Sequence, residues 1–178
     1  GNNRDSWYLA YIMDTSGEER EKGKTVEVGY APFHTDKKRY MILDAPGHAA
    51  YVPSMISGTS QADVAVLIIS ARKSEFEAGF QRGGQTCEHA LLARALGVQR
   101  IIVAVNKMDE STVQWSEKRY SYIVGKVGTY LTKIGFKRGE VSYVPISGLT
   151  GLNIRDAVTP DVCPWLSDEK RRSLIDEL

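Results

Sequence analysis

The stretch Arg100-Ile-Ile-Val-Ala-Val105, followed directly by Asn106-Lys-Met-Asp109, decides the fold of this chain. Its apolar residues are mostly β-branched, which predicts a strand that is buried on both faces. Two other segments have the same character, Asp63-Val-Ala-Val-Leu-Ile-Ile-Ser70 and Val141-Ser-Tyr-Val-Pro-Ile146. Strands that are apolar on both faces are typical of parallel sheets covered by helices. The sequence therefore predicts a parallel sheet.

Segments with the pattern of amphipathic helices alternate with these strands and follow the last one. Residues 85–96 end before Gly97, a typical helix C-terminus, and place three apolar side chains on one face: Leu92, Ala95 and Leu96. Residues 116–134 carry five apolar side chains at helical spacing: Ile123, Val127, Tyr130, Leu131 and Ile134. A further helix is predicted over residues 168–178. This alternation predicts an α/β fold with a mostly parallel, doubly wound sheet.

An antiparallel hairpin is predicted upstream of the parallel strands. Val26-Glu-Val-Gly-Tyr-Ala-Pro-Phe33 and Arg39-Tyr-Met-Ile-Leu-Asp44 read as strands, and the polar turn Thr35-Asp-Lys-Lys38 separates them. Pro32 has no N–H to donate to a neighbouring strand, so the first strand of the hairpin is expected at the edge of a sheet.

The composition is that of one globular domain, residues 1–178, without a membrane span. The net charge is +1 and 42% of the residues are hydrophobic. This balanced charge argues against direct, sequence-specific nucleic-acid binding. The longest apolar run, residues 64–69, is far shorter than the roughly 20 residues that span a bilayer. Because Cys87 and Cys163 cannot build a disulfide framework, we expect a cytoplasmic location.

Two predicted loops have the residue types that recognise guanine. Asp109 can accept hydrogen bonds from guanine N1–H and the exocyclic amine, a pattern that adenine lacks. Asn106 can bond N7 and pin the loop, and the stem of Lys107 can cover the ring. The turn Ser147-Gly-Leu149 can offer backbone N–H groups to guanine O6. The alternative is that both are ordinary polar loops, with Asp109 capping the next helix.

A second set of candidate residues suits the phosphate end of a nucleotide. In Asp44-Ala-Pro-Gly-His48, Asp44 can hold a magnesium-bound water and Gly47 lets a backbone N–H approach the terminal phosphate. Thr25, at the end of a charged stretch, can ligate Mg²⁺ while that phosphate is present. His48 follows the turn and is the candidate catalytic residue. The alternatives are a tight turn at a strand end and a solvated charged surface around Thr25.

The motifs together resemble those of the translational GTPases of the elongation-factor-like branch: Thr25, Asp44-Ala-Pro-Gly-His48, Asn106-Lys-Met-Asp109 and Ser147-Gly-Leu149. Three further segments are similar to the release-factor subfamily of that branch: Gly23-Lys-Thr-Val-Glu-Val-Gly29, Ser70-Ala-Arg-Lys73 and Cys163-Pro-Trp165. The resemblance implies a P-loop NTPase-type G domain in which the hairpin is an antiparallel edge. No Gly-x-x-x-x-Gly-Lys-[Ser/Thr] motif occurs, so the N-terminal strand and the phosphate loop are expected to be missing from this partial domain.

The resemblance also implies a function, the hydrolysis of GTP to GDP and phosphate in translation termination. The partners would be the ribosome and the stop-codon-reading release factor. Thr25 and Asp44 would organise Mg²⁺, and His48 would be catalytic. GTP would bind through Asp44, Gly47, Asn106, Lys107, Asp109, Ser147 and Gly148. The piece alone is expected to be inactive. Alternatives are an aminoacyl-tRNA carrier like elongation factor 1-alpha, a ribosome-rescue GTPase, or a GTP-sensing module with weak hydrolysis.

Four positions depart from the residues that the resemblance leads us to expect. Ala49 stands where Lys is expected, Cys87 where Arg is expected, Pro32 where an aromatic residue is expected, and Ser74 where Gly is expected. None of them removes a group that would contact the nucleotide.

Overall fold

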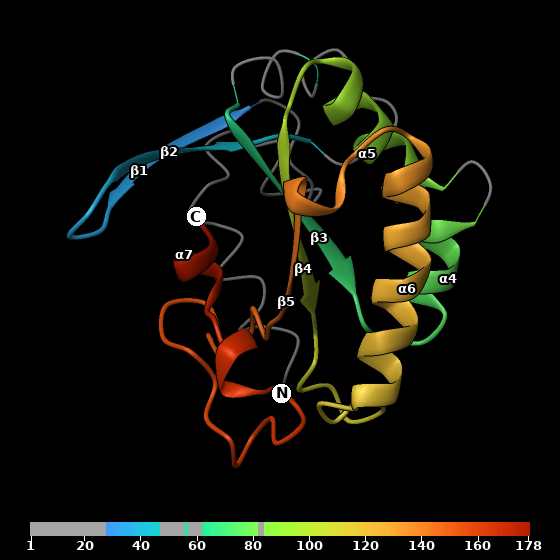
Figure 1. The fold of residues 1–178 in the computed structure, drawn as a ribbon, viewed down its shortest axis with the longest axis vertical. Coiled ribbons are helices and arrows are strands. Elements are labelled where there is room, and N and C mark those ends of the chain that lie inside the picture. The colour runs from blue at the N-terminus through green and yellow to red at the C-terminus, as the bar shows by residue number, and fades with distance from the viewer. Residues whose placement is uncertain (1–27, 47–55, 57–61, 82–83) are drawn as a thin grey trace, which may run out of the picture. The chain divides into compact units, whose positions relative to one another are not determined.

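The computed structural model describes residues 28–46, 56, 62–81 and 84–178, which fall into two units. The first unit, Gly1–Ala62, contains a two-stranded antiparallel sheet, and the second, Asp63–Leu178, contains a three-stranded parallel sheet with its helices (Figure 1). Among the helices that the structure describes, none combines the length and the hydropathy needed to span a bilayer. The α/β architecture predicted from the sequence is confirmed.

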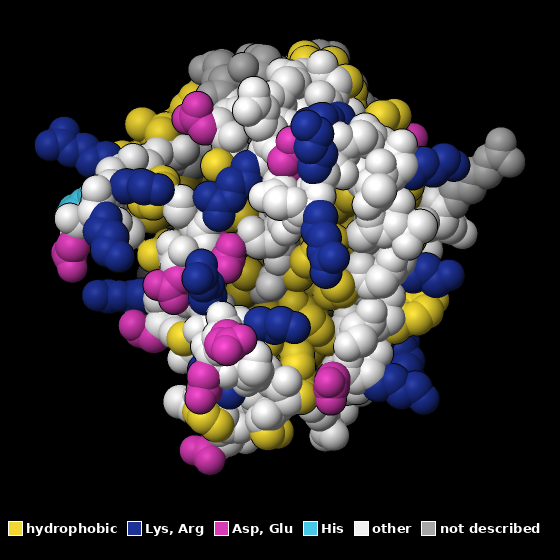
Figure 2. All heavy atoms as spheres, in the orientation of Figure 1, with side chains coloured by type: hydrophobic (Ala, Val, Ile, Leu, Met, Phe, Trp, Pro, Cys, Tyr) yellow, Lys and Arg dark blue, Asp and Glu magenta, His cyan; other side chains and the backbone are white. Residues whose placement is uncertain are grey.

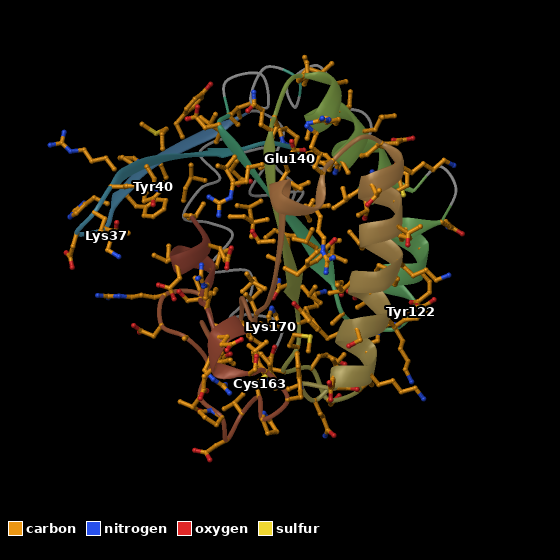
Figure 3. All side chains as sticks on the ribbon, viewed as in Figure 1. Lys37, Tyr40, Tyr122, Glu140, Cys163 and Lys170 are labelled. Carbon is orange, nitrogen blue, oxygen red and sulfur yellow. The ribbon has the colours of Figure 1, made fainter. Side chains whose placement is uncertain are left out.

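The first unit contains the predicted hairpin. Strand β1 (Gly29–His34) pairs antiparallel with β2 (Arg39–Asp44) in the register that sets His34 opposite Arg39. The rings of Phe33 and Tyr40 stack across the pair with centroids 4.7 Å apart (Tyr40 is labelled in Figure 3). Within the described residues β1 pairs with β2 alone, as its proline predicts.

The second unit is built on the three apolar segments. β3 (Val64–Ser70), β4 (Arg100–Asn106) and β5 (Val141–Pro145) form a parallel sheet in the order β3-β4-β5. The register sets Ser70 opposite Asn106, so the carboxyl ends of these strands meet at one edge of the sheet. Figure 1 shows the arrowheads of β3 and β4 pointing to this edge. It carries the loops that include residues 70–75, 106–110 and 147–153.

One face of this sheet is covered by α4 (Glu75–Phe80), α5 (Gln85–Ala95) and α6 (Glu117–Lys133) (Figure 1). The core between them includes Ile69, Ile101, Val103, Val105, Phe76, Ile123, Val127 and Leu131. The prediction for α6 is confirmed, since Ile123, Val127 and Leu131 are its buried side chains. Ser116 caps its N-terminus by accepting a hydrogen bond from the Arg119 N–H.

The other face packs against the C-terminal segment, which includes η3 (Asp168–Lys170) and α7 (Leu174–Glu177); η2 (Arg138–Glu140) precedes β5. This smaller core joins side chains of β4 and β5 to that segment: Ile102, Ala104, Val144, Ile146, Ile154, Leu174 and Leu178. The continuous helix predicted over residues 168–178 is wrong. Arg171 interrupts it, because its guanidinium donates to the carbonyls of Val158, Cys163 and Leu166.

Two details of burial also differ from the sequence prediction. The buried residues of α5 are Ala90 and Ala93 rather than the predicted leucine face. Small side chains let this helix approach the sheet closely. On β3, Ile68 is 53% exposed, so this strand is not covered on both faces as its apolar sequence predicted. Of the strands that the structure describes, only the central strand β4 is buried throughout its apolar run.

Candidate nucleotide-binding site

Asn106, the last residue of β4, joins three segments of the chain. Its side-chain Oδ1 accepts hydrogen bonds from the backbone N–H of Lys107 at 2.7 Å and of Gly148 at 2.8 Å. Its backbone carbonyl accepts from the N–H of Ala71, which follows β3, at 2.7 Å. Among the described residues the Asn106 Nδ2 has no acceptor. The Asn106 side chain thus joins the loop after β4 to the loop after β5.

The loop after Asn106 turns its polar side chains away from the core. Met108 is fully buried, and its N–H donates to the Ile146 carbonyl at 3.2 Å. Lys107 has a φ of 63°, in the left-handed region that a side chain rarely adopts. Asp109 is half-buried and makes no hydrogen bond or ion pair with the residues that the structure describes. Its carboxylate therefore keeps its acceptor capacity for a ligand.

The loop after β5 is held rigidly around Ser147, which is fully buried. The Ser147 N–H donates to the Leu152 carbonyl at 3.0 Å, and its Oγ accepts from the Thr150 hydroxyl at 2.7 Å. A Cβ placed on Gly148 would lie 3.2 Å from the Asn106 Nδ2, so a larger residue would push this amide aside. The N–H groups of Ser147 and Gly148 are thus donated within the protein, and these two residues shape the loop.

Asn153 also supports this loop, and the sequence analysis missed it. Its side chain is buried, with Nδ2 donating to the Pro145 carbonyl at 2.8 Å and Oδ1 accepting from the Val158 N–H at 2.7 Å. Its φ of 60° lies in the left-handed region, which asparagine tolerates better than most residues. The Gly151-Leu-Asn153 sequence was the available signal.

A cluster of charged side chains connects the turn after β3 to the loop after β4. Lys107 Nζ lies 2.7 Å from Glu75 Oε2, the same oxygen that accepts the Ser70 hydroxyl at 2.7 Å. Arg72 contacts Glu75 Oε1 at 3.2 Å and Glu110 Oε1 at 3.7 Å. The hydrogen bonds from Lys107 and Ser70 lower the pKa of Glu75. No local pattern in the sequence indicates these contacts.

Arg119 fixes the same turn from the side of α6. Its Nε donates to the buried Ala71 carbonyl at 2.7 Å, and its guanidinium pairs with Glu77 at 2.7 Å. The Arg119 side chain is only 12% exposed. Ser74, the N-cap of α4, has a φ of 66° without a side-chain capping hydrogen bond. The departure from the expected Gly therefore places a strained residue at this turn.

The predicted phosphate-side residues are only partly described. Asp44 closes β2 opposite Gly29 and is half-buried. Thr25, Gly47 and His48 lie outside the described residues, and so does Ala49. The described residues contain no group of three or more acidic, His or Cys side chains that could hold a metal ion.

Both signs of charge are interspersed on the face of the molecule in Figure 2, in keeping with the net charge of +1.

Comparison with known proteins shows which proteins this chain resembles. The eukaryotic peptide chain release factor GTP-binding subunits of Debaryomyces hansenii and Candida albicans are each 54% identical over 175 residues, 98% of this chain. The match covers 25% and 24% of those proteins, so the chain spans about a quarter of their length. A solved structure of sup35 complexed with GDP matches with a TM-score of 0.69 and 40% identity, covering 96% of this chain and 38% of that one.

A family model covers nearly the whole sequence. The model described as "Elongation factor Tu GTP binding domain" matches residues 2–176. This match agrees with the α/β fold, a parallel sheet together with an antiparallel hairpin. The chain belongs to the family of the elongation factor Tu GTP binding domain.

Proposed function

We propose that residues 1–178 are part of one GTP-binding domain that binds and hydrolyses GTP in translation termination. The stop-codon-reading release factor and the ribosome would be its partners in the cytoplasm. The observation that carries the proposal is the half-buried Asp109 carboxylate, which has no partner among the described residues and stands on a loop anchored by Asn106. The relatives, which are eukaryotic peptide chain release factor GTP-binding subunits, support the assignment to termination.

The base would bind at the edge where β4 and β5 end. Asp109 would accept from guanine N1–H and the exocyclic amine, while Asn106 Nδ2 would donate to N7. Ser147 and Gly148 would hold the second loop beside the base. The N–H of Leu149, which donates to no described residue, would face guanine O6. Lys107, whose side chain is half exposed, would cover one face of the ring with its methylene stem.

The phosphates would meet Gly47, and His48 would position the attacking water. Mg²⁺ would be held by the Thr25 hydroxyl and through water by Asp44, and it would neutralise charge on the phosphates. The donor set of one carboxylate and one hydroxyl fits Mg²⁺, which usually keeps several waters and takes few protein ligands.

Substitution of Asp109 tests the base site. In the full-length protein, Asp109→Asn exchanges one acceptor for a donor, so GTP affinity should fall and xanthosine triphosphate affinity should rise. The loss of a charge-assisted pair corresponds to about 2–3 kcal/mol, or about 30- to 150-fold in the GTP Kd. Isothermal titration with both nucleotides measures the shift. An unchanged preference for GTP would remove Asp109 from the base site.

Substitution of His48 tests catalysis separately from binding. His48→Ala in the full-length protein should leave the GTP Kd within a few-fold but lower ribosome-stimulated hydrolysis by roughly 100-fold or more. Phosphate release measured with and without ribosomes gives both quantities. If the wild-type protein binds GTP and ribosomes leave its turnover unchanged, the protein is a GTP-sensing module and the catalytic assignment is wrong.

A further inference from the structure

We propose that Glu75 is a positioning residue for guanine recognition, acting by fixing the ammonium group of Lys107. This inference rests on the proposed function, because it assigns Lys107 to one face of the guanine ring. It adds a residue from α4, which lies far from the guanine loop in the sequence and carries none of the expected recognition motifs.

The lysine is held at both ends. Its backbone N–H donates to Asn106 Oδ1 at 2.7 Å, and its Nζ lies 2.7 Å from Glu75 Oε2. The Lys107 side chain, which runs between these two anchors, is 47% exposed. A free lysine side chain samples many rotamers and loses that freedom when a ring packs against it. A stem already fixed at both ends has lost most of that freedom before the nucleotide arrives.

Glu75 is itself fixed in place. Its Oε2 also accepts the Ser70 hydroxyl at 2.7 Å, and its Oε1 contacts Arg72 at 3.2 Å. Arg72 in turn reaches Glu110, the residue after Asp109, at 3.7 Å. Ionic contacts therefore join the turn after β3 to the guanine loop on both sides of Asp109. Both strained residues of this region, Ser74 and Lys107, neighbour these contacts in the sequence.

The short helix that carries Glu75 is anchored to α6. Phe76 is buried, and Arg119 pairs with Glu77 at 2.7 Å while its Nε holds the Ala71 carbonyl. Glu77 thus provides a matched control. It is a carboxylate on the same helix with its own ion pair, and it contacts Arg119 instead of Lys107.

The experiment compares Glu75→Gln with Glu77→Gln in the full-length protein, using a GDP analogue with a fluorescent group on the ribose and unlabelled GTP as competitor. We expect Glu75→Gln to raise the Kd of GDP and of GTP by the same factor, about 5-fold, the size expected for a partly exposed ion pair that orders one lysine. The Glu77→Gln variant should stay within about 2-fold of the wild type. Equal effects of the two variants would overturn the proposal.

A double-substitution cycle separates positioning from loss of structure. If Glu75 acts through Lys107, then Glu75→Gln should add no further loss of affinity in the Lys107→Gln background. A Glu75 effect of full size in that background would overturn the proposal. So would a change in the GTP-to-GDP affinity ratio, because the base is common to both nucleotides.

The Asp109→Asn variant is measured in parallel to keep the two proposals apart. If it does not lower GDP affinity, the guanine site itself is misassigned and the role of Glu75 falls with it. If Asp109→Asn weakens GDP binding while Glu75→Gln matches the Glu77→Gln control, the guanine site stands and only the positioning role of Glu75 is refuted.

Discussion

Two substitutions of Asn106 separate its structural contacts from its proposed contact with the base. Asn106→Ala removes both the Oδ1 acceptor and the Nδ2 donor. Asn106→Asp keeps an oxygen in place of Oδ1, so the Lys107 and Gly148 N–H groups keep their acceptor. At the same time it replaces the Nδ2 donor with an oxygen, which would repel guanine N7. The alanine variant should therefore lose stability and binding, and the aspartate variant should lose mainly binding.

The magnitudes follow from the surroundings of the two N–H groups. The hydrogen bond to Gly148 is part-buried, so leaving its N–H unpaired costs about 1–3 kcal/mol. The hydrogen bond from the Lys107 N–H is exposed, so water can replace the lost acceptor. Its removal should lower the free energy of unfolding by about 0.5–1.5 kcal/mol. Asn106→Ala should thus cost roughly 2–4 kcal/mol, a decrease of roughly 5–15 °C in Tm for a domain of this size.

Thermal unfolding and nucleotide titration of the full-length protein measure the two effects. The Tm of Asn106→Asp should fall by no more than about 4 °C, corresponding to about 1 kcal/mol. Its GDP affinity should fall by about 10- to 100-fold, which corresponds to about 1.4–2.8 kcal/mol. Equal losses of Tm in the two variants would show that the Oδ1 contacts do not hold the loops together. Wild-type GDP affinity in Asn106→Asp would show that the side chain does not meet the base.

Two further predictions concern single side chains of the second unit. Ser74→Gly should raise the Tm by about 1–4 °C in a thermal melt. It relieves about 1–2 kcal/mol of left-handed strain, and the greater freedom of glycine in the unfolded chain offsets about 0.4–1 kcal/mol of this gain. A lower Tm than that of the wild type would show that the Ser74 φ of 66° carries less strain than this. Cys163 is fully buried, and burial raises its pKa to about 11. An aromatic disulfide reagent at pH 7.5 should therefore modify Cys87 first and Cys163 only on unfolding; modification of Cys163 in the native protein at an equal rate would contradict this.

The sequence was sufficient to predict the parallel strands because their apolar, largely β-branched residues favour extended structure, although the burial of β3 was overestimated. The apolar residues of β4 are buried on both faces, and a run of β-branched residues indicates that environment without knowledge of the partners. The position of the loop after β4 could be predicted as well, because a loop must follow where the predicted strand ends. The sequence predicted that the Asn106 side chain anchors a loop, but it did not identify the Gly148 N–H as the partner.

The remaining features depend on contacts between distant segments. Helix α5 buries Ala90 and Ala93, because the distance to the sheet, which the sequence does not contain, favours small side chains there. The pairing of Glu75 with Lys107 likewise requires two turns to meet at one edge. The interruption at Arg171 depends on carbonyl groups that only the folded segment brings together. Hydrophobic periodicity and secondary-structure propensity are local properties of the sequence, so they cannot predict contacts between distant segments.

The parallel order of β3, β4 and β5 has a consequence for how the domain folds. Each neighbouring pair, such as Ile69 with Val105, is joined by a long crossover that includes a helix, so the chain must close large loops before strand ends can meet. In the proposed function the guanine base binds to loops at these strand ends, and an unfolded chain would not hold those loops together. A bound nucleotide would therefore favour the folded form by mass action, by about 2.7 kcal/mol at 100 times its Kd. The folded fraction of the domain would then depend on the concentration of free guanine nucleotide.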